Sequence, residues 1–474
     1  MKILLITTSI EVESREPIEA SSHYPLGLSY IHSYLEKFGH TVSLLFLNNY
    51  SDAACDEKIV ESLQEFSPDV VGFQLITHNR VSSFRNIEFV HENYPDIRIV
   101  IGGIHTTLMY EQILRKYNYL TAVLGEGEIT FQELIDTFEN NGELNRVNGI
   151  AYCDKRTNSV IATNGRELIK DLDALPFPKH ESYFNGERDT ANLLTSRGCP
   201  YACSFCVLDS ISRRKVRLRS VDNVISEIEY LVSSFSTLKK IWIHDDCFLI
   251  DNKRVINLCN EIVKRNIVLK FVCSARFKPL SKELVEALEK AGFVLVLFGM
   301  ETGSAKLLKS SHKGIKKEEM EKAYRLFAAS SIDIAGFLIV GLYGEDENTI
   351  METAHFIQGL QKIKYSHFDD IGVLAIYPGT EIYKIAKESG MITDDYWMTD
   401  KPVPLFTAEH SRETLFKYKE VLLDHIAVKR LYTANGFKAQ WPLMLHIFLW
   451  RYFLRRKNQV RRKFIKWKRI LSLS

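Results

Sequence analysis

The stretch SRGCPYACSFCVLDS (residues 196–210) holds three of the chain's eight cysteines. Cys199, Cys203 and Cys206 follow the spacing C-x3-C-x2-C, directly after an apolar segment at 192–196 that we expect to be a strand. Three thiolates on one short loop can hold three irons of a [4Fe-4S] cluster, whereas a fourth thiolate would complete it. The pattern therefore predicts a cluster with one iron open to a substrate or cosubstrate.

Other uses of these thiols fit the spacing less well. Structural zinc sites take four ligands, commonly in paired C-x2-C spacing, and neither a second pair nor a nearby His matches here. Surface thiols or a disulfide remain as alternatives, against which the compactness of the triplet argues. The other five cysteines are scattered, which is typical of a cytoplasmic protein with one thiolate site rather than of a disulfide scaffold.

The cysteine loop opens a series of alternating strand and helix patterns that predicts a barrel-like domain at 191–390. Expected strands lie at 192–196, 240–244, 269–274, 294–299, 333–340 and 371–376. Helical periodicity lies between them at 221–235, 252–265, 281–291, 317–330 and 348–362. Six βα units make most, though not all, of a TIM-like barrel, whose active sites lie at the carboxyl ends of the strands. The cysteine loop falls at that end of the first strand.

The triplet, with Phe205 before its third cysteine, resembles the signature of the radical S-adenosylmethionine (SAM) superfamily. The resemblance continues through IWIHDDCF (241–248), VCSARF (272–277), LFGMETGS (297–304) and GFLIVGLYGED (336–346), which look like that family's second to fifth barrel strands. It implies SAM on the open iron. The contacts that it implies for SAM are Phe205, Asp245, Asp246, Arg276, Gly299, Glu301 and Gly341. Charged groups at successive strand ends also suit a zwitterionic ligand across a barrel mouth.

The first 145 residues predict a different domain, a doubly wound, Rossmann-like parallel sheet. Expected strands at 3–7, 41–46, 69–75, 97–101 and 120–124 alternate with amphipathic helical stretches. A G-x-G-x-x-G motif does not follow the first strand, which disfavours a dinucleotide. We expect a polar linker at 146–190 and a helical region at 391–474.

Three glycine-containing stretches of this first domain resemble the cobalamin-binding domain that precedes the radical SAM domain in one large subgroup. They are HYPLGLSYIHSYLEKFGHTV (23–42), IVIGGIHTT (99–107) and VLGEGEITFQELI (123–135). The resemblance implies base-off cobalamin, with its nucleotide tail in the sheet and its corrin facing the cluster. The D-x-H-x-x-G motif that supplies an axial His to cobalt in many cobalamin domains is absent. The implied cobalamin contacts are Gly27, Thr77, Gly102, Gly103, His105, Gly125 and Glu126.

Charge is distributed unevenly along the chain. Residues 451–474 carry ten Lys or Arg and no acid, and the other residues hold 51 basic against 59 acidic side chains. Aromatic residues among these cations suit a helix lying in an anionic membrane surface. A solvated helix packed on the barrel and RNA binding are alternatives, although we do not expect nucleic acid as a partner. Without a recognisable signal peptide or membrane-spanning run, the sequence predicts a cytoplasmic protein. The basic tail adds the option of peripheral attachment to the inner membrane surface.

The leading hypothesis for activity is a cobalamin-dependent C-methyltransferase that cleaves SAM to a 5′-deoxyadenosyl radical and acts on an unactivated carbon. The resemblance also implies a small-molecule or lipid substrate and an electron donor such as flavodoxin or ferredoxin. Cyclisation or oxidation without methyl transfer is the main alternative. A transfer-RNA methylthiotransferase ranks lower, because such enzymes carry three further N-terminal cysteines and this chain has only Cys55 and Cys153 there. A non-enzymatic corrinoid or iron–sulfur carrier would not need the charged residues at the strand ends.

Overall fold

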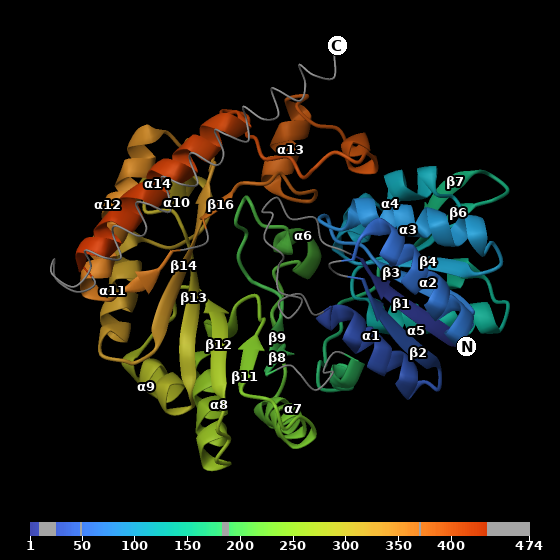
Figure 1. Ribbon diagram of the computed structural model, residues 1–474, viewed down its shortest axis with the longest axis horizontal. Helices are drawn as coiled ribbons and strands as arrows, with labels where there is room; N and C mark the ends of the chain where they lie inside the picture. Colours follow the sequence, from blue (N-terminus) through green and yellow to red (C-terminus); the bar gives the residue numbers. More distant parts are fainter. Residues whose placement is uncertain (9–24, 48–49, 183–188, 369–370, 434–474) are drawn as a thin grey trace, which may run out of the picture.

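The computed structural model describes residues 1–8, 25–47, 50–182, 189–368 and 371–433 (Figure 1). Its N-terminal sheet has seven strands in the order β2-β1-β3-β4-β5-β6-β7. They are β1 (Lys2–Thr7), β2 (Thr41–Phe46), β3 (Val70–Gln74), β4 (Arg98–Gly102), β5 (Thr121–Val123), β6 (Ile150–Asp154) and β7 (Ser159–Ala162). The first five are parallel, and their order reverses direction beside β1 and β3. Ligands of open parallel sheets bind at such a switch point, beyond the carboxyl ends of the strands.

Helices cover both faces of this sheet. On one face, α1 (Leu26–Lys37) and α5 (Gly127–Glu139) pack against residues such as Leu5 and Val100. The other face carries α2 (Asp52–Phe66), α3 (Arg80–Asn93) and α4 (Ile104–Lys116), together with residues 375–403 of the C-terminal region. Both faces of the strands are therefore buried, which explains why the strands form continuous apolar runs.

The second sheet is parallel throughout, in the order β15-β14-β13-β12-β11-β8, with β16 paired to β14. Its strands are β8 (Thr190–Leu193), β11 (Lys240–Ile243), β12 (Lys270–Ala275), β13 (Phe293–Glu301), β14 (Asp333–Val340), β15 (Ser366–His367) and β16 (Ile371–Val373). Its helices are α7 (Val221–Ser234), α8 (Asn252–Lys264), α9 (Lys282–Lys290), α10 (Ala305–Ser310), α11 (Lys317–Ala328) and α12 (Glu347–Ile363). The predicted partial barrel and doubly wound sheet are both confirmed.

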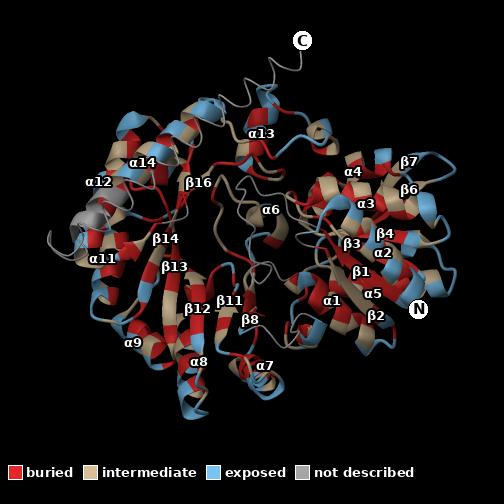
Figure 2. Ribbon diagram, viewed as in Figure 1, coloured by how far each residue is buried: buried red, intermediate tan, exposed pale blue. Residues whose placement is uncertain are grey.

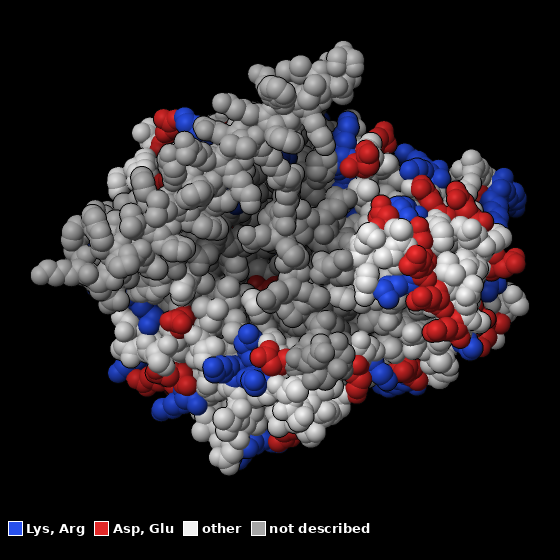
Figure 3. Space-filling view, viewed as in Figure 1, with Lys and Arg blue, Asp and Glu red and all other residues white. Residues whose placement is uncertain are grey.

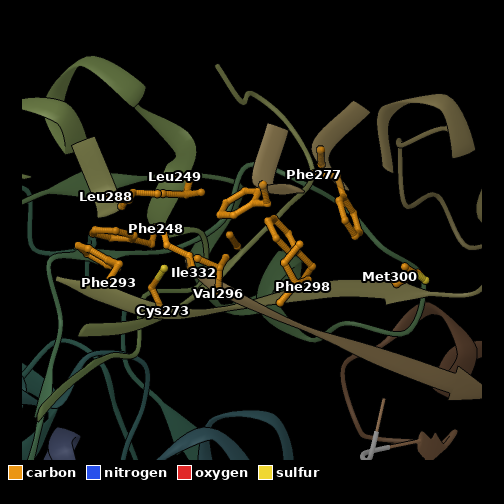
Figure 4. Packing of buried hydrophobic residues seen from close by; sticks show 14 of the residues in the cluster. Phe248, Leu249, Cys273, Phe277, Leu288, Phe293, Val296, Phe298, Met300 and Ile332 are labelled. Atoms are coloured by element: carbon orange, nitrogen blue, oxygen red, sulfur yellow. The ribbon is translucent and has the colours of Figure 1, made fainter. Parts of the chain in front are cut away.

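Side-chain caps explain why several barrel helices begin where their periodicity begins. Ser220, Asp251 and Ser281 each accept a hydrogen bond from the backbone N–H three residues later. Such caps satisfy amide groups that the first helical turn leaves without partners. The helices then bury their apolar stripe on the sheet, where Phe277 stacks on Phe298 with ring centroids 4.5 Å apart (Figure 4). Figure 2 shows buried residues concentrated along both sheets.

Two connecting regions differ from the sequence prediction. Within the expected linker at 146–190, β6 and β7 form an antiparallel hairpin that adds two strands to the N-terminal sheet. Within the expected helical region at 391–474, the described part contains a short 3-10 turn at Asp394–Met398, an irregular segment and the long helix α14 (Arg412–Thr433). The helix α13 (Glu381–Glu388) precedes them. The basic tail at 451–474 lies outside the described residues.

Cations and anions are interspersed over the described surface in the view of Figure 3. No helix in the described part of the chain is both long and apolar enough to cross a membrane.

Candidate active site

The three cysteines lie on a loop held at its base by a short hairpin. Strand β9 (Ser196–Arg197) pairs antiparallel with β10 (Arg217–Leu218), and the loop between them contains α6 (Leu208–Ser212). Figure 1 shows α6 between the two sheets. Gly198 has φ of +92°, and a Cβ there would lie 2.1 Å from the carbonyl oxygen of Lys215. The glycine therefore lets the two arms of the loop close next to the first cysteine.

All three thiols of the loop lie at least partly below the protein surface. Cys199 and Cys203 are buried and Cys206 is half-buried. Among the residues that the structure describes, no three His, Cys, Asp or Glu side chains converge closely enough to hold a single metal ion. Each cysteine of a [4Fe-4S] cluster binds a different iron. The donor set thus fits a cluster.

Two neighbouring groups affect the thiols directly. A hydrogen bond from Cys247, just beyond β11, holds the pKa of Cys199 below its ordinary value, while burial raises the pKa of Cys206. Arg276 Nη1 lies 3.6 Å from Cys203 Sγ, within reach of a hydrogen bond to sulfur. The position of Cys247 could not be predicted from the spacing of the triplet.

Asp245 and Asp246 lie at the carboxyl end of β11, where the sequence predicts them to contact SAM. Asp245 is buried, and it accepts hydrogen bonds of 2.6 Å from Thr195 N, Thr195 Oγ1 and Ser196 Oγ. Burial raises its pKa despite these bonds. Asp246 accepts a 2.9 Å bond from Gly198 N and lines the large cavity described below. Asp245 is therefore fully occupied in positioning the start of the cysteine loop, and Asp246 is the more accessible carboxylate.

Across the barrel mouth, Arg276 and Glu301 come together with the cysteine loop. The guanidinium of Arg276 lies 3.7 Å from the ring centroid of Tyr201 and also donates to the carbonyl of Lys313. Lys313 Nζ donates to Glu301 Oε1 at 2.6 Å, and both side chains are buried. The structure therefore adds Lys313, a loop lysine without a distinguishing sequence pattern, to the predicted pair.

The remaining predicted SAM contacts lie around this ion pair and on the next strand. A Cβ at Gly299 would lie 2.6 Å from Glu301 Oε1, so the glycine leaves room for the pair. The ring centroid of Phe205 lies 5.9 Å from Lys313 Nζ. Gly341 follows β14, and its N–H donates to the buried carboxylate of Glu345.

A cavity of about 360 Å³ extends from the N-terminal sheet to the cysteine loop. It lies on the sheet face that α1 and α5 cover, and Gly27, Gly102, Gly103, Gly125 and Glu126 line it as the sequence predicts. At Gly125, with φ of +78°, a Cβ would meet no atom within 4 Å and would occupy free space. Gly198, Leu208, Ile211 and Ser212 of the cysteine loop form part of the same wall. A cavity lined by glycines and apolar side chains, with charged groups at the cysteine loop, fits a large cofactor.

Two predicted cobalamin contacts lie outside this lining. His105, in α4, is fully buried, its Nδ1 lies 3.3 Å from Thr77 Oγ1, and its ring packs edge-on against Trp397. Burial and the nearby Arg80 lower the pKa of His105 to about 3, so the imidazole is neutral. Both residues belong to the sheet face opposite α1 and α5. Both residues follow strands of the sheet, β3 and β4, but His105 packs under Trp397 of the C-terminal region and Thr77 lies beside it.

Comparisons with known proteins agree with both halves of this architecture. Residues 20–135 match the family described as B12 binding domain, and residues 193–357 match the Radical SAM superfamily. An uncharacterized methyltransferase of Pyrococcus horikoshii is 26% identical over 92% of this chain and 96% of its own length. The anaerobic magnesium-protoporphyrin IX monomethyl ester cyclase of Rubrivivax gelatinosus is 30% identical over 69% of this chain and 61% of its own.

A solved structure shares the whole arrangement. The cobalamin-dependent SAM radical enzyme OxsB, with aqua-cobalamin bound, superimposes with a TM-score of 0.73 at 19% identity, over 95% of this chain and 71% of OxsB. The two family matches lie in this order along the chain, and the shared fold extends through both. The chain belongs to the radical SAM superfamily, in the subgroup in which a cobalamin-binding domain precedes the radical SAM domain.

Proposed function

We propose that this chain is a cobalamin-dependent radical SAM methyltransferase acting on an unactivated carbon of a small molecule or lipid. One observation carries the proposal: the glycine-lined cavity of the N-terminal domain and the cysteine loop share a wall formed by Gly198 and α6. A ligand in the cavity would therefore lie next to whatever the cysteines hold. The similarity to the Pyrococcus horikoshii methyltransferase over nearly the full length of both chains supports the same reaction class.

We assign the cofactor sites residue by residue. Cys199, Cys203 and Cys206 would hold a [4Fe-4S] cluster, and Arg276, Glu301 and Lys313 would surround SAM together with Phe205, Gly299 and Gly341. Gly27, Gly102, Gly103 and Gly125 would lie against cobalamin. When bound, these groups supply a reducing electron, a primary carbon radical derived from SAM and a transferable methyl group.

The chain's own residues bind and orient these groups. The buried Glu301–Lys313 pair presents one anionic and one cationic group at the barrel mouth, which suits the amino and carboxylate groups of a methionine moiety. Asp246 adds a second carboxylate beside Gly198. Arg276 packs over Cys203 and Tyr201, where it would help to exclude water from that side of the loop. Such a site excludes solvent from reactive species.

Label transfer tests the methyltransferase assignment. The anaerobically reconstituted full chain, supplied with cobalamin, reductant and SAM carrying a deuterated methyl group, is incubated with extracts of its source cells. We expect a product heavier by three mass units than the one formed with unlabelled SAM. A product that appears only with the enzyme and carries no label would instead indicate cyclisation or oxidation, the alternative that the cyclase from Rubrivivax gelatinosus favours.

We further propose two partners for the chain, an electron donor and a membrane surface. An external one-electron donor such as flavodoxin or ferredoxin would reduce the cluster in the cytoplasm. The ten cations at 451–474 would hold the enzyme at an anionic membrane surface, which would suit a lipid substrate. Vesicles of phosphatidylglycerol should sediment the full chain, whereas phosphatidylcholine vesicles should not, and replacing the ten cations by Ser should abolish the difference. Equal sedimentation with both lipids would contradict this assignment.

A further inference from the structure

Two arginines face each other at the base of the cysteine loop. Arg197 in β9 and Arg217 in β10 are direct partners in the antiparallel pair. Like charges in this arrangement repel, and the hairpin has only two residues on each strand to oppose that repulsion. The hairpin that encloses all three cysteines therefore depends on anions from outside it.

Glu126 supplies the shared anion. Arg217 Nη1 donates to both of its carboxylate oxygens at 2.8 and 2.7 Å, and Arg197 Nη1 donates to Oε1 at 3.2 Å. Burial alone would raise the pKa of Glu126, but the hydrogen bond from Arg217 and the charge of Arg197 hold it below its ordinary value. Its carboxylate is thus ionised and shared between the two strands.

The same carboxylate belongs to the N-terminal domain. Glu126 lies between Gly125 and the first residue of α5, and its carboxylate accepts a 2.8 Å bond from Ile169 N of the connecting segment. Arg197 Nη2 also donates to Oε1 of Glu128, which lies in the first turn of α5, at 2.6 Å. The cluster of Glu126, Glu128, Arg197 and Arg217 therefore joins α5 to the cysteine loop through charge-assisted bonds.

The four residues of this cluster also line the large cavity. A cofactor that fills the cavity contacts one side of the cluster, and a metal centre that orders the cysteines fixes the loop on the other side. We propose that Glu126 is a positioning residue that couples the two cofactor sites, so that the cluster-loaded chain binds corrinoid more tightly than the cluster-free chain. This inference rests on the proposed function and assigns Glu126 a coupling role in addition to its place in the cavity lining.

The test measures the affinity of the full chain for hydroxocobalamin, with and without its iron–sulfur cluster, by anaerobic absorbance titration. Energetic coupling between sites commonly amounts to 5–150-fold in affinity. We expect wild-type protein to bind at least about fivefold more tightly when loaded, and Glu126→Gln to reduce that ratio to below about twofold. Glu133→Gln is the matched control, because Glu133 lies on the same helix and pairs with Arg166 away from the cysteine loop.

A second pair of variants separates coupling from simple loss of structure. Arg217→Lys keeps a cation beside Glu126 and should retain most of the wild-type ratio, whereas Arg217→Met should behave as Glu126→Gln does. A wild-type ratio near one, or an unchanged ratio in both Glu126→Gln and Arg217→Met, would overturn the inference while leaving the proposed function intact. If neither form of the wild-type chain binds hydroxocobalamin, the proposed function itself fails.

Discussion

Asp245 and Asp246 are neighbours after one strand, yet their carboxylates hold different parts of the cysteine loop. Asp245 satisfies the hydroxyl and amide groups of Thr195 and Ser196, whereas Asp246 holds the amide of Gly198. A buried carboxylate with three donors is costly to alter, because each donor would lose its partner in a place that water does not reach. The two carboxylates therefore hold the start of the cysteine loop in place.

The thiols give the simplest prediction at the residue scale. Cys203→Ala should lower the iron content of the reconstituted chain from about four atoms to below about one, since each cysteine of a three-thiolate site binds its own iron. Cys153→Ser is the control, because Cys153 is half-exposed on β6 in the N-terminal sheet. Iron and sulfide analysis provides the measurement. Equal iron in wild type and Cys203→Ala would rule out this site.

Asp245→Asn distinguishes positioning from ligand binding. The substitution places an amide N–H₂ among groups that themselves donate, so we expect a loss of roughly 2 kcal/mol in the free energy of unfolding. Chemical denaturation of the cluster-free chain measures this loss. Asp246→Asn should cost less stability, because in the described part of the chain Asp246 accepts one hydrogen bond, from Gly198 N, where Asp245 accepts three. A stable Asp245→Asn variant that fails only in SAM binding would instead favour the direct contact with SAM that the sequence predicts.

The sequence predicts the motifs of the site more reliably than the position of each residue within them. The cysteines, Arg276 and Glu301 could be placed because each lies at or just beyond the end of a barrel strand, and carboxyl ends of parallel strands meet at one edge. Thr77 and His105 also follow strands, but the turn before each helix directs them to the opposite face. Lys313 comes from a loop without periodicity, so the sequence alone could not reveal its buried pairing with Glu301.

Elements were predicted well wherever periodicity and capping agree. The expected helix at 252–265 corresponds to α8, which Asp251 caps and whose apolar stripe packs on the sheet. The hairpin of β6 and β7 was missed because its strands are short and half-exposed, so they show little alternation. Tertiary pairing to β5 stabilises them, and that contribution is invisible in a local pattern.

The loop after β14 gives a prediction at the element scale. Burial raises the pKa of Glu345 to about 7, even though Gly341 N donates to it. Because the folded-state pKa exceeds the unfolded one, the stabilisation is complete below about pH 4.5 and is lost as the pH rises through about 7. Between those pH values the free energy of unfolding should therefore fall less in Glu345→Gln than in the wild type, by on the order of 2 kcal/mol. Urea denaturation at intervals of pH measures the two slopes, and parallel slopes would contradict the raised pKa.

At the scale of the whole molecule, the N-terminal sheet and the cysteine loop of the barrel domain border one continuous cavity. The cavity starts over the N-terminal sheet and ends at the cysteine loop, and residues 375–403 of the C-terminal region pack on the N-terminal domain from the other side. The order of the two domains along the chain was predictable from motifs. Their contact through Glu126, Arg197 and Arg217 was not, because no local pattern pairs residues so far apart in sequence.

Reductive cleavage of SAM by the full chain tests the proposed radical chemistry most directly. The anaerobically reconstituted protein is mixed with dithionite and SAM, and 5′-deoxyadenosine and methionine are quantified by liquid chromatography. We expect both products to form, to require reductant, and to disappear in Cys203→Ala but persist in Cys153→Ser. Absence of 5′-deoxyadenosine from wild-type protein that carries a full complement of iron and sulfide would contradict a radical SAM activity of this chain.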